Sequence, residues 1–302
     1  MVQAHCERRV QRHCCHQPLT VLQSPNSPHL TTAVPSAPVG VFDSGVGGLS
    51  ILQALQQQLP NESFVYLADS AHAPYGERDE EFVLQRARSV LHLLHAQHHI
   101  KALVIACNTA TALAIKVLRE ENPDLSIVGV EPAIKPAAIL SQTRRIGVMA
   151  TAATLSSSKF QDLLAGLSPQ ADFVLQACEG LADAIEQQWQ QTDGQTVLAL
   201  CRKYVEAMGA FGTKAGEIDT LVLGCTHYPF AKPELQSLLG TDVALVESGL
   251  PVAKRLQQLL SEQQLLSRQT QPGLQLIATG ETLNLQTAVR VWLHQSLPVI
   301  RV

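Results

Sequence analysis

From Val39 onward, short apolar runs rich in β-formers alternate with longer segments whose apolar residues recur at helical spacing. The helical segments include Leu49–Leu59, Glu81–His95 and Ala110–Glu120. The predicted strands are Val39–Phe42, Ser63–Ala68, Ala102–Ala106, Ile127–Val130, Arg145–Met149, Asp172–Gln176, Thr220–Leu223, Ala244–Val246 and Leu274–Ala278. Such alternation is typical of parallel sheets covered by helices on both faces, so we predict an α/β fold.

The two halves of this region repeat one arrangement of strands and cysteines. In the first half a strand ends at Phe42, and a later strand runs directly into Cys107. In the second half the strand around Gly147 is followed by a later strand that runs into Cys225. Ligands bind at the carboxyl ends of strands in open α/β sheets. The repeat therefore predicts two related α/β lobes, each of which places one thiol at a ligand-binding strand end.

Composition excludes several classes of protein. The 302 residues carry a formal net charge of -4, which argues against an enzyme that binds nucleic acid directly through a strong basic field. The sequence has no apolar run of the roughly 20 residues that span a bilayer and no secretory signal, so we expect a cytoplasmic protein without membrane contact. Its seven cysteines favour free or catalytic thiols over a disulfide framework.

Residues 1–37 differ from the remainder of the chain. They contain His5, Cys6, His13, Cys14, Cys15 and His16, followed by a stretch rich in Ser, Pro and Thr. Such a composition cannot bury enough apolar surface to order itself, so we predict a disordered extension. A metal site is the alternative, but the spacing fits no structural zinc pattern, and we predict no metal here.

A glycine-rich turn follows the first strand, in the segment Val41–Ser50. Glycines allow the backbone to approach a ligand closely, and the N-terminus of a helix attracts anions. The segment matches neither a Walker A loop nor a dinucleotide fingerprint. It predicts an anion nearby, or simply a tight turn between a strand and a helix.

Each cysteine of the repeat is followed by polar side chains. Cys107 lies between a strand and a helix, where thiol pKa values fall, and Asn108 and Thr109 are hydrogen-bond donors suited to a carboxylate. Cys225 precedes Thr226 and His227, and the imidazole is placed to exchange a proton with the thiol or to orient it. A buried structural cysteine and a zinc site are the alternative interpretations, although no paired ligands stand at zinc-finger spacing.

The segment Asp69–Arg78 contains the turn Pro74-Tyr75-Gly76. It is either an ordinary loop or a loop that closes over a substrate and offers amides to a carboxylate.

Together these segments resemble one family. The motifs VFDSGVGGLS, PYGER, ACNTAT, GVEPAIKPA and LGCTHYPF, in this order, are similar to those of bacterial glutamate racemases, and the resemblance runs from about residue 39 to the C-terminus. Smaller similarities are ATAATLSS from Ala150, the stretch from Cys178 to Glu186, VESG and ATGE. The resemblance implies two pseudo-symmetric α/β domains with the active site in the cleft between them. The first would comprise residues 38–129 and 252–302, and the second residues 130–251.

The resemblance also implies roles for the motif residues. Cys107 and Cys225 would be the catalytic acid/base pair, acting on the α-protons of D- and L-glutamate respectively. The substrate would be lined by Asp43, Ser44, Tyr75, Gly76, Asn108, Thr109, Thr226 and His227. The chain departs from the family at His72, where we expect a basic residue, often Arg, and at Phe160, where Tyr is common. These departures leave undecided which contacts the segment Asp69–Arg78 makes.

The implied chemistry is proton exchange at the α-carbon, for peptidoglycan synthesis. One base cannot readily serve both faces of a held substrate, whereas a thiolate and a thiol on opposite faces can exchange roles. We expect no cofactor, although a Schiff-base lysine stays open. Fixed donors such as Asn108, Thr109, Thr226 and backbone amides would then stabilise the carbanion, while Asp43 and His227 would tune the thiols.

Other functions stay open. A sister racemase that acts on aspartate is the nearest alternative, and a hydrolase with one nucleophilic cysteine is another. The resemblance further implies possible partners: UDP-N-acetylmuramoyl-alanine as an activator, DNA gyrase as a protein that some relatives bind, and a second copy in a homodimer.

Overall fold

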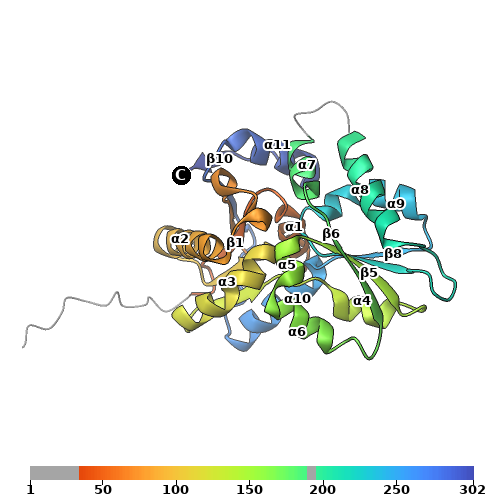
Figure 1. Ribbon diagram of the computed structural model, residues 1–302. Coiled ribbons are helices and arrows are strands. Elements are labelled where there is room, and N and C mark those ends of the chain that lie inside the picture. Colours follow the sequence, from red (N-terminus) through yellow and green to blue (C-terminus); the bar gives the residue numbers. More distant parts are fainter. Residues whose placement is uncertain (1–33, 189–194) are drawn as a thin grey trace, which may run out of the picture. The chain divides into compact units, whose positions relative to one another are not determined.

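A computed structural model describes residues 34–188 and 195–302 (Figure 1). The extension predicted for residues 1–37 lies outside the described residues except for its last four. Nine of the ten strands in the described part are those predicted, with ends that differ by at most one residue. The tenth, Val299–Arg301, was missed, because a three-residue edge strand after a Leu-Pro pair is too short to show a period.

The strands form two parallel sheets. One sheet has six strands, in the order β10-β9-β2-β1-β3-β4, and the other has four, in the order β6-β5-β7-β8. The first comprises β1 (Val39–Asp43), β2 (Phe64–Ala68), β3 (Ala102–Ile105), β4 (Ser126–Gly129), β9 (Leu274–Ala278) and β10 (Val299–Arg301). The second comprises β5 (Arg145–Ala150), β6 (Asp172–Ala177), β7 (Thr220–Leu223) and β8 (Ala244–Val246).

The same strand order appears in both sheets. In β2-β1-β3-β4 and in β6-β5-β7-β8, the second strand of the chain lies on one side of the first, and the third lies on the other side. The order therefore reverses between β1 and β3, and again between β5 and β7. Such a switch point opens a crevice at the carboxyl ends of the strands. The predicted repeat is thus confirmed as a repeat of topology, with Cys107 after β3 and Cys225 after β7.

Helices cover both faces of each sheet (Figure 1). Core contacts place α1 (Leu49–Gln58), α10 (Gly249–Glu262) and α11 (Thr282–Trp292) on one face of the larger sheet, and α2 (Glu80–His98) and α3 (Asn108–Glu121) on the other. The smaller sheet packs against α7 (Leu181–Gln187), α8 (Gln195–Met208) and α9 (Lys232–Leu239) on one face, and against α4 (Ile134–Leu140), α5 (Ala152–Ser156) and α6 (Ser158–Ala165) on the other. Short 3-10 turns are η1 (Ser70–His72), η2 (Tyr75–Glu77) and η3 (Tyr228–Ala231).

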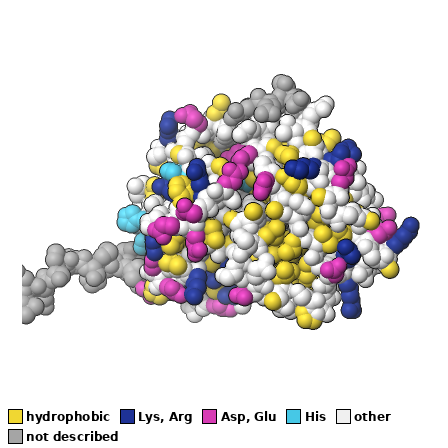
Figure 2. Space-filling view, in the orientation of Figure 1, with side chains coloured by type: hydrophobic (Ala, Val, Ile, Leu, Met, Phe, Trp, Pro, Cys, Tyr) yellow, Lys and Arg dark blue, Asp and Glu magenta, His cyan; other side chains and the backbone are white. Residues whose placement is uncertain are grey.

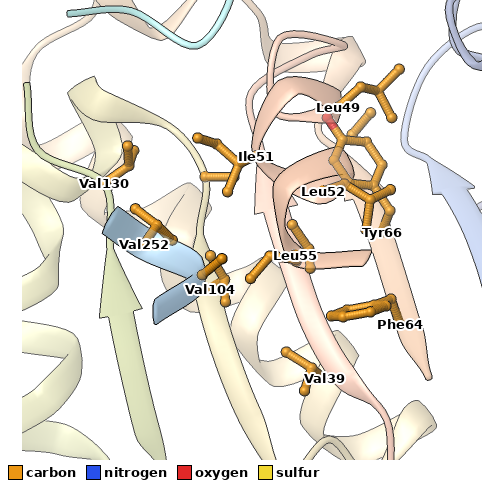
Figure 3. Packing of buried hydrophobic residues seen from close by; sticks show 14 of the residues in the cluster. Val39, Leu49, Ile51, Leu52, Leu55, Phe64, Tyr66, Val104, Val130 and Val252 are labelled. Atoms are coloured by element: carbon orange, nitrogen blue, oxygen red, sulfur yellow. The ribbon is translucent and has the colours of Figure 1, made fainter. Parts of the chain in front are cut away.

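The core of the larger sheet shows why its strands are apolar throughout. Val39 points into the α1–α10 layer, which also contains Leu52 and Leu55 of α1 and Val104 of β3 (Figure 3). Phe42 faces the opposite layer, formed by α2 and α3. Because alternate residues of a strand face opposite sides, a sheet covered on both sides needs apolar residues at every position.

The strands that carry the two thiols thus belong to different sheets, joined by the segments around 130 and 247. Ser248 Oγ donates to the backbone oxygen of Glu131 at 2.7 Å and ties these two connections together. The division into domains at residues 130 and 251 stays a prediction. Within residues 34–188 and 195–302, no helix combines the length and the apolar character needed to cross a bilayer.

Candidate active site

A cavity of about 340 Å³ lies where the carboxyl ends of the two sheets meet, a volume suited to a small metabolite. Nine of the ten predicted site residues line it: Ser44, Tyr75, Gly76, Cys107, Asn108, Thr109, Cys225, Thr226 and His227. The other lining residues are Ala73, Pro74, Glu77, Thr151, Ala152, Cys178, Glu179, Gly180, Ala182, Asp183 and Glu186. None of these side chains is a lysine or an arginine, so an anionic ligand must be bound by hydroxyls, amides and the imidazole.

Cys107 is the N-cap of α3. Its extended backbone turns the Sγ back onto the helix, where the amide of Ala110 donates to the sulfur at 3.4 Å. The thiol in turn reaches Ser44 Oγ at 3.7 Å. The sequence suggested a lowered pKa at this position, and that expectation is wrong. Burial and the nearby Asp43 carboxylate raise the pKa of Cys107 to about 12, outweighing the Ala110 amide and Ser44.

Cys225 follows β7 and has an imidazole beside it. Its Sγ lies 3.7 Å from His227 Nδ1, and His227 Nε2 lies 2.9 Å from Glu186 Oε2. Burial would lower the pKa of His227, but the hydrogen bonds with Cys225 and Glu186 raise it well above its ordinary value. The imidazole therefore connects the Cys225 thiol to the Glu186 carboxylate through one chain of contacts.

Glu186 was not predicted as a site residue. It lies on α7, 41 residues before its partner His227, and only its place in the Cys178–Glu186 stretch of the resemblance could have indicated it. The same stretch brings a third thiol, Cys178, to the cavity wall. Cys178 Sγ donates to the carbonyl of Gln176 at 3.4 Å, and burial raises its pKa.

Asp43 is the one predicted residue that does not line the cavity. It is fully buried behind it, where Oδ1 accepts from the Gly45 amide at 2.8 Å and Oδ2 accepts from Thr226 Oγ1 at 3.1 Å. Burial raises the pKa of Asp43 to about 6, although His227 and these hydrogen bonds oppose the change. Asp43 thus connects the two sides of the site without reaching the space that a substrate would occupy.

The glycine-rich turn after β1 makes room for the opposite lobe. A Cβ atom added at Gly45 would collide with the Glu186 carboxylate, and one at Gly47 would collide with the ring of His227. Only glycine admits so close an approach. The two lobes also meet through hydroxyls, because Thr109 Oγ1 lies 3.1 Å from Thr151 Oγ1.

Four carboxylates line the cavity: Glu77 comes from the first lobe, and Glu179, Asp183 and Glu186 come from the second. Glu77 of η2 faces Asp183 and Glu186 of α7, and burial together with the charges of Glu77 and Glu186 raises the pKa of Asp183. Acidic side chains gather near the middle of the molecular face that Figure 2 shows. In the described part of the chain, no group of three or more His, Cys, Asp or Glu side chains is arranged to hold a metal ion.

Comparison with known proteins assigns a family to this site. The model of the Asp/Glu/Hydantoin racemase family matches residues 39–254. The glutamate racemase of Ectopseudomonas mendocina is 45% identical over 263 residues, which cover 87% of this chain and 97% of that protein. Two solved structures cover the same region at lower identity. The glutamate racemase of Francisella tularensis in complex with D-glutamate superposes with a TM-score of 0.75 at 28% identity, covering 89% of this chain and 98% of the other.

The second solved structure is that of Escherichia coli glutamate racemase in complex with L-glutamate and the activator UDP-MurNAc-ala. It superposes with a TM-score of 0.75 at 27% identity, covering 88% of this chain and 97% of the other. Together with two parallel sheets that place one thiol each at a shared cavity, these similarities show that the chain belongs to the Asp/Glu/Hydantoin racemase family, among its glutamate racemases.

Proposed function

We propose that the cavity racemises glutamate by a two-thiol proton transfer between Cys107 and Cys225, without a cofactor. The observation that carries this proposal is the pairing of two buried thiols from opposite lobes in one cavity. The relatives with bound D-glutamate and L-glutamate support glutamate, and not aspartate, as the substrate.

The two thiols act on opposite faces of the substrate. Burial and the Asp43 carboxylate raise the pKa of Cys107 to about 12, which keeps the proton on its sulfur. His227 is the group placed to exchange a proton with Cys225. Turnover of L-glutamate starts at Cys225. The Cys225 thiolate removes the α-proton, the electron pair stays on the substrate as a carbanion, and the Cys107 thiol delivers its proton to the opposite face. Turnover of D-glutamate runs through the reversed protonation state.

The carbanion needs stabilisation as its charge spreads into the α-carboxylate. The donors at the cavity are the side chains of Asn108 and Thr109, together with backbone amides at the start of α3. The Thr226 hydroxyl, which the sequence suggested as a further donor, already donates its one proton to Asp43. Preorganised donors of this kind in a closed site stabilise a developing oxyanion more than water does. Asp43 and Glu186 hold the Thr226 and His227 side chains in place from behind.

Circular dichroism of each glutamate enantiomer tests this function directly. Wild-type protein should abolish the circular dichroism signal of L-glutamate and of D-glutamate alike. Cys107→Ala and Cys225→Ala should each lower the rate at least about 1,000-fold, in line with loss of a general acid or base. Cys201→Ala is the matched control, because Cys201 is buried in the α8 core and does not line the cavity. Activity that survives in either cavity variant would refute the two-thiol mechanism. Activity lost at one cysteine only would favour a nucleophilic hydrolase.

Activation by UDP-N-acetylmuramoyl-alanine is a separate proposal, supported by the Escherichia coli relative with that activator bound. Rates measured with and without the nucleotide should differ, and a chain that begins at residue 34 should show whether the N-terminal segment takes part. Gyrase binding, a homodimer and a cytoplasmic location stay predictions from the sequence.

A further inference from the structure

Asp69 is a buried carboxylate that four side chains contact. It follows β2 and has no exposed surface. The Tyr75 hydroxyl donates to Oδ2 at 2.6 Å. The Arg86 guanidinium donates to both oxygens, from Nε to Oδ2 at 2.9 Å and from Nη2 to Oδ1 at 2.9 Å. This two-point geometry is the strong form of an arginine–carboxylate pair.

Two further groups complete the contacts. Thr279 Oγ1, after β9, donates to Asp69 Oδ1 at 2.8 Å, and it also accepts from the amide of Ala71 at 3.2 Å. His72 Nδ1 lies 3.0 Å from the same Oδ1. Burial would raise the pKa of Asp69, but the hydrogen bonds from Arg86, Tyr75 and Thr279 lower it below its ordinary value. The carboxylate is thus charged near neutral pH and has its acceptor positions filled.

The anchored segment is the one that forms the first lobe's wall of the cavity. Tyr75 is buried, and its ring packs edge-on against Phe42 and Phe82. A Cβ atom on Gly76 would approach the Thr151 side chain of the opposite lobe to 3.1 Å. The phenol's only proton is already donated to Asp69, so Tyr75 offers the cavity its ring and backbone. A small shift of this segment would therefore change the binding surface at both Tyr75 and Gly76.

We propose that Arg86 is a positioning residue of the active site: from helix α2 it clamps the buried Asp69 carboxylate, which holds Tyr75 and Gly76 against the cavity. Arg86 does not line the cavity itself. His72 cannot replace it, since a third of the His72 side chain is exposed and imidazole carries charge only when protonated. Arginine is charged at every accessible pH and grips both carboxylate oxygens at once. The inference rests on the proposed function, because its readout is glutamate turnover.

The test compares Arg86→Gln and Arg86→Lys with Arg88→Gln. Arg88 is a matched control on the same helix, where it pairs with Glu121 at the surface. We expect Arg86→Gln to raise KM about tenfold for both enantiomers while kcat changes less than about threefold, since a loosened wall weakens binding of ground state and transition state alike. Arg86→Lys should restore part of the loss, because it keeps the charge without the fork. Arg88→Gln should match wild type.

A double-mutant cycle separates positioning from general stability. If Arg86 acts through Asp69 on Tyr75, then Arg86→Gln should raise KM less in a Tyr75→Phe background than in wild type. A wild-type KM in folded Arg86→Gln, or a lower melting temperature with unchanged KM, would overturn the proposal. Should Arg86→Gln fail to fold, the same two criteria apply to Arg86→Lys. Activity retained in the Cys107 or Cys225 variants would refute the thiol mechanism but leave the KM comparison at Arg86 valid.

Discussion

The two thiols of the cavity stand at equivalent strand ends, yet they have different neighbours. Cys107 caps a helix of 14 residues and contacts only neutral groups, the Ala110 amide and the Ser44 hydroxyl. Cys225 precedes a 3-10 turn and contacts an imidazole that a carboxylate holds from behind. Repeated topology therefore fixes where the thiols lie, while the side chains around each thiol differ. Cys225, unlike Cys107, has an imidazole in contact with its sulfur, so the two faces of the substrate meet thiols with different proton-transfer partners.

The two enantiomers of glutamate have equal free energies, which limits how the difference between the two thiols can be observed. Because the equilibrium constant of racemisation is one, every variant must have the same kcat/KM in both directions. An asymmetry can appear only in the separate kcat and KM values and in isotope effects on each direction.

Loss of the imidazole should have the largest effect. We expect His227→Asn to lower kcat at least about 100-fold, the scale of a lost acid–base partner. The variant should also slow proton removal by Cys225 selectively. The primary isotope effect with α-deuterated L-glutamate should then exceed that with α-deuterated D-glutamate. Equal isotope effects in the two directions would mean that His227 does not serve Cys225 in particular.

Asp43 links the two sides of the site, and its buried carboxylate should lower the stability of the folded protein at neutral pH. Its folded pKa is raised from 3.8 to about 6, so the folded state binds the proton more tightly than the unfolded state. The stability contributed by the protonated Asp43 carboxyl is fully present below pH 3.8 and is lost as pH rises through 6. At pH 7 the free energy of unfolding is therefore lower by about 3 kcal/mol, since one pKa unit is about 1.4 kcal/mol.

Asp43→Asn should therefore unfold at higher urea concentration than wild type at pH 7, and the gap should close toward pH 4. Its activity should fall, because function and stability conflict at such sites. A difference in urea midpoint that does not change with pH would contradict a raised pKa of Asp43 in the folded state.

On the Cys107 side, Ser44→Ala should have a smaller effect. It removes one hydroxyl that the thiol reaches at 3.7 Å, a contact worth about 0.5–1.5 kcal/mol, so we expect kcat to fall about 3- to 10-fold. Steady-state kinetics in both directions will check this. A loss as large as that of His227→Asn would show that the two sides do not differ as described.

The smallest effect should come from the carboxylates at the cavity. Glu77 and Asp183 repel an anionic substrate, so Asp183→Asn should raise kcat/KM by about twofold at low ionic strength. The gain should vanish near 0.5 M salt, where the Debye length is only about 4 Å and charges farther apart are screened. A gain that persists at high salt would indicate a steric effect instead.

Two features of the site show why its residues were only partly predictable. Cys107, Asn108 and Thr109 are consecutive, and so are Cys225, Thr226 and His227, so each set follows from one strand end. Glu186 and Arg86 reach their partners across 41 and 17 residues respectively. No local period marks such contacts, because they depend on how α7 and α2 pack. The pKa of Cys107 was misjudged for the same reason: the helix N-terminus is local, while burial and Asp43 are tertiary.

Sequence patterns were sufficient to predict the α/β class, nine strands, the repeat of two lobes and the thiol at each strand end. These follow from residue periods and from the order of motifs, which are local properties of the chain. Only the folded structure established the edge strand β10, the contact of Glu186 with His227, the contact of Arg86 with Asp69 and the burial that raises the pKa of Cys107. The physical reason is that burial and long-range electrostatics arise only when distant segments meet and exclude water.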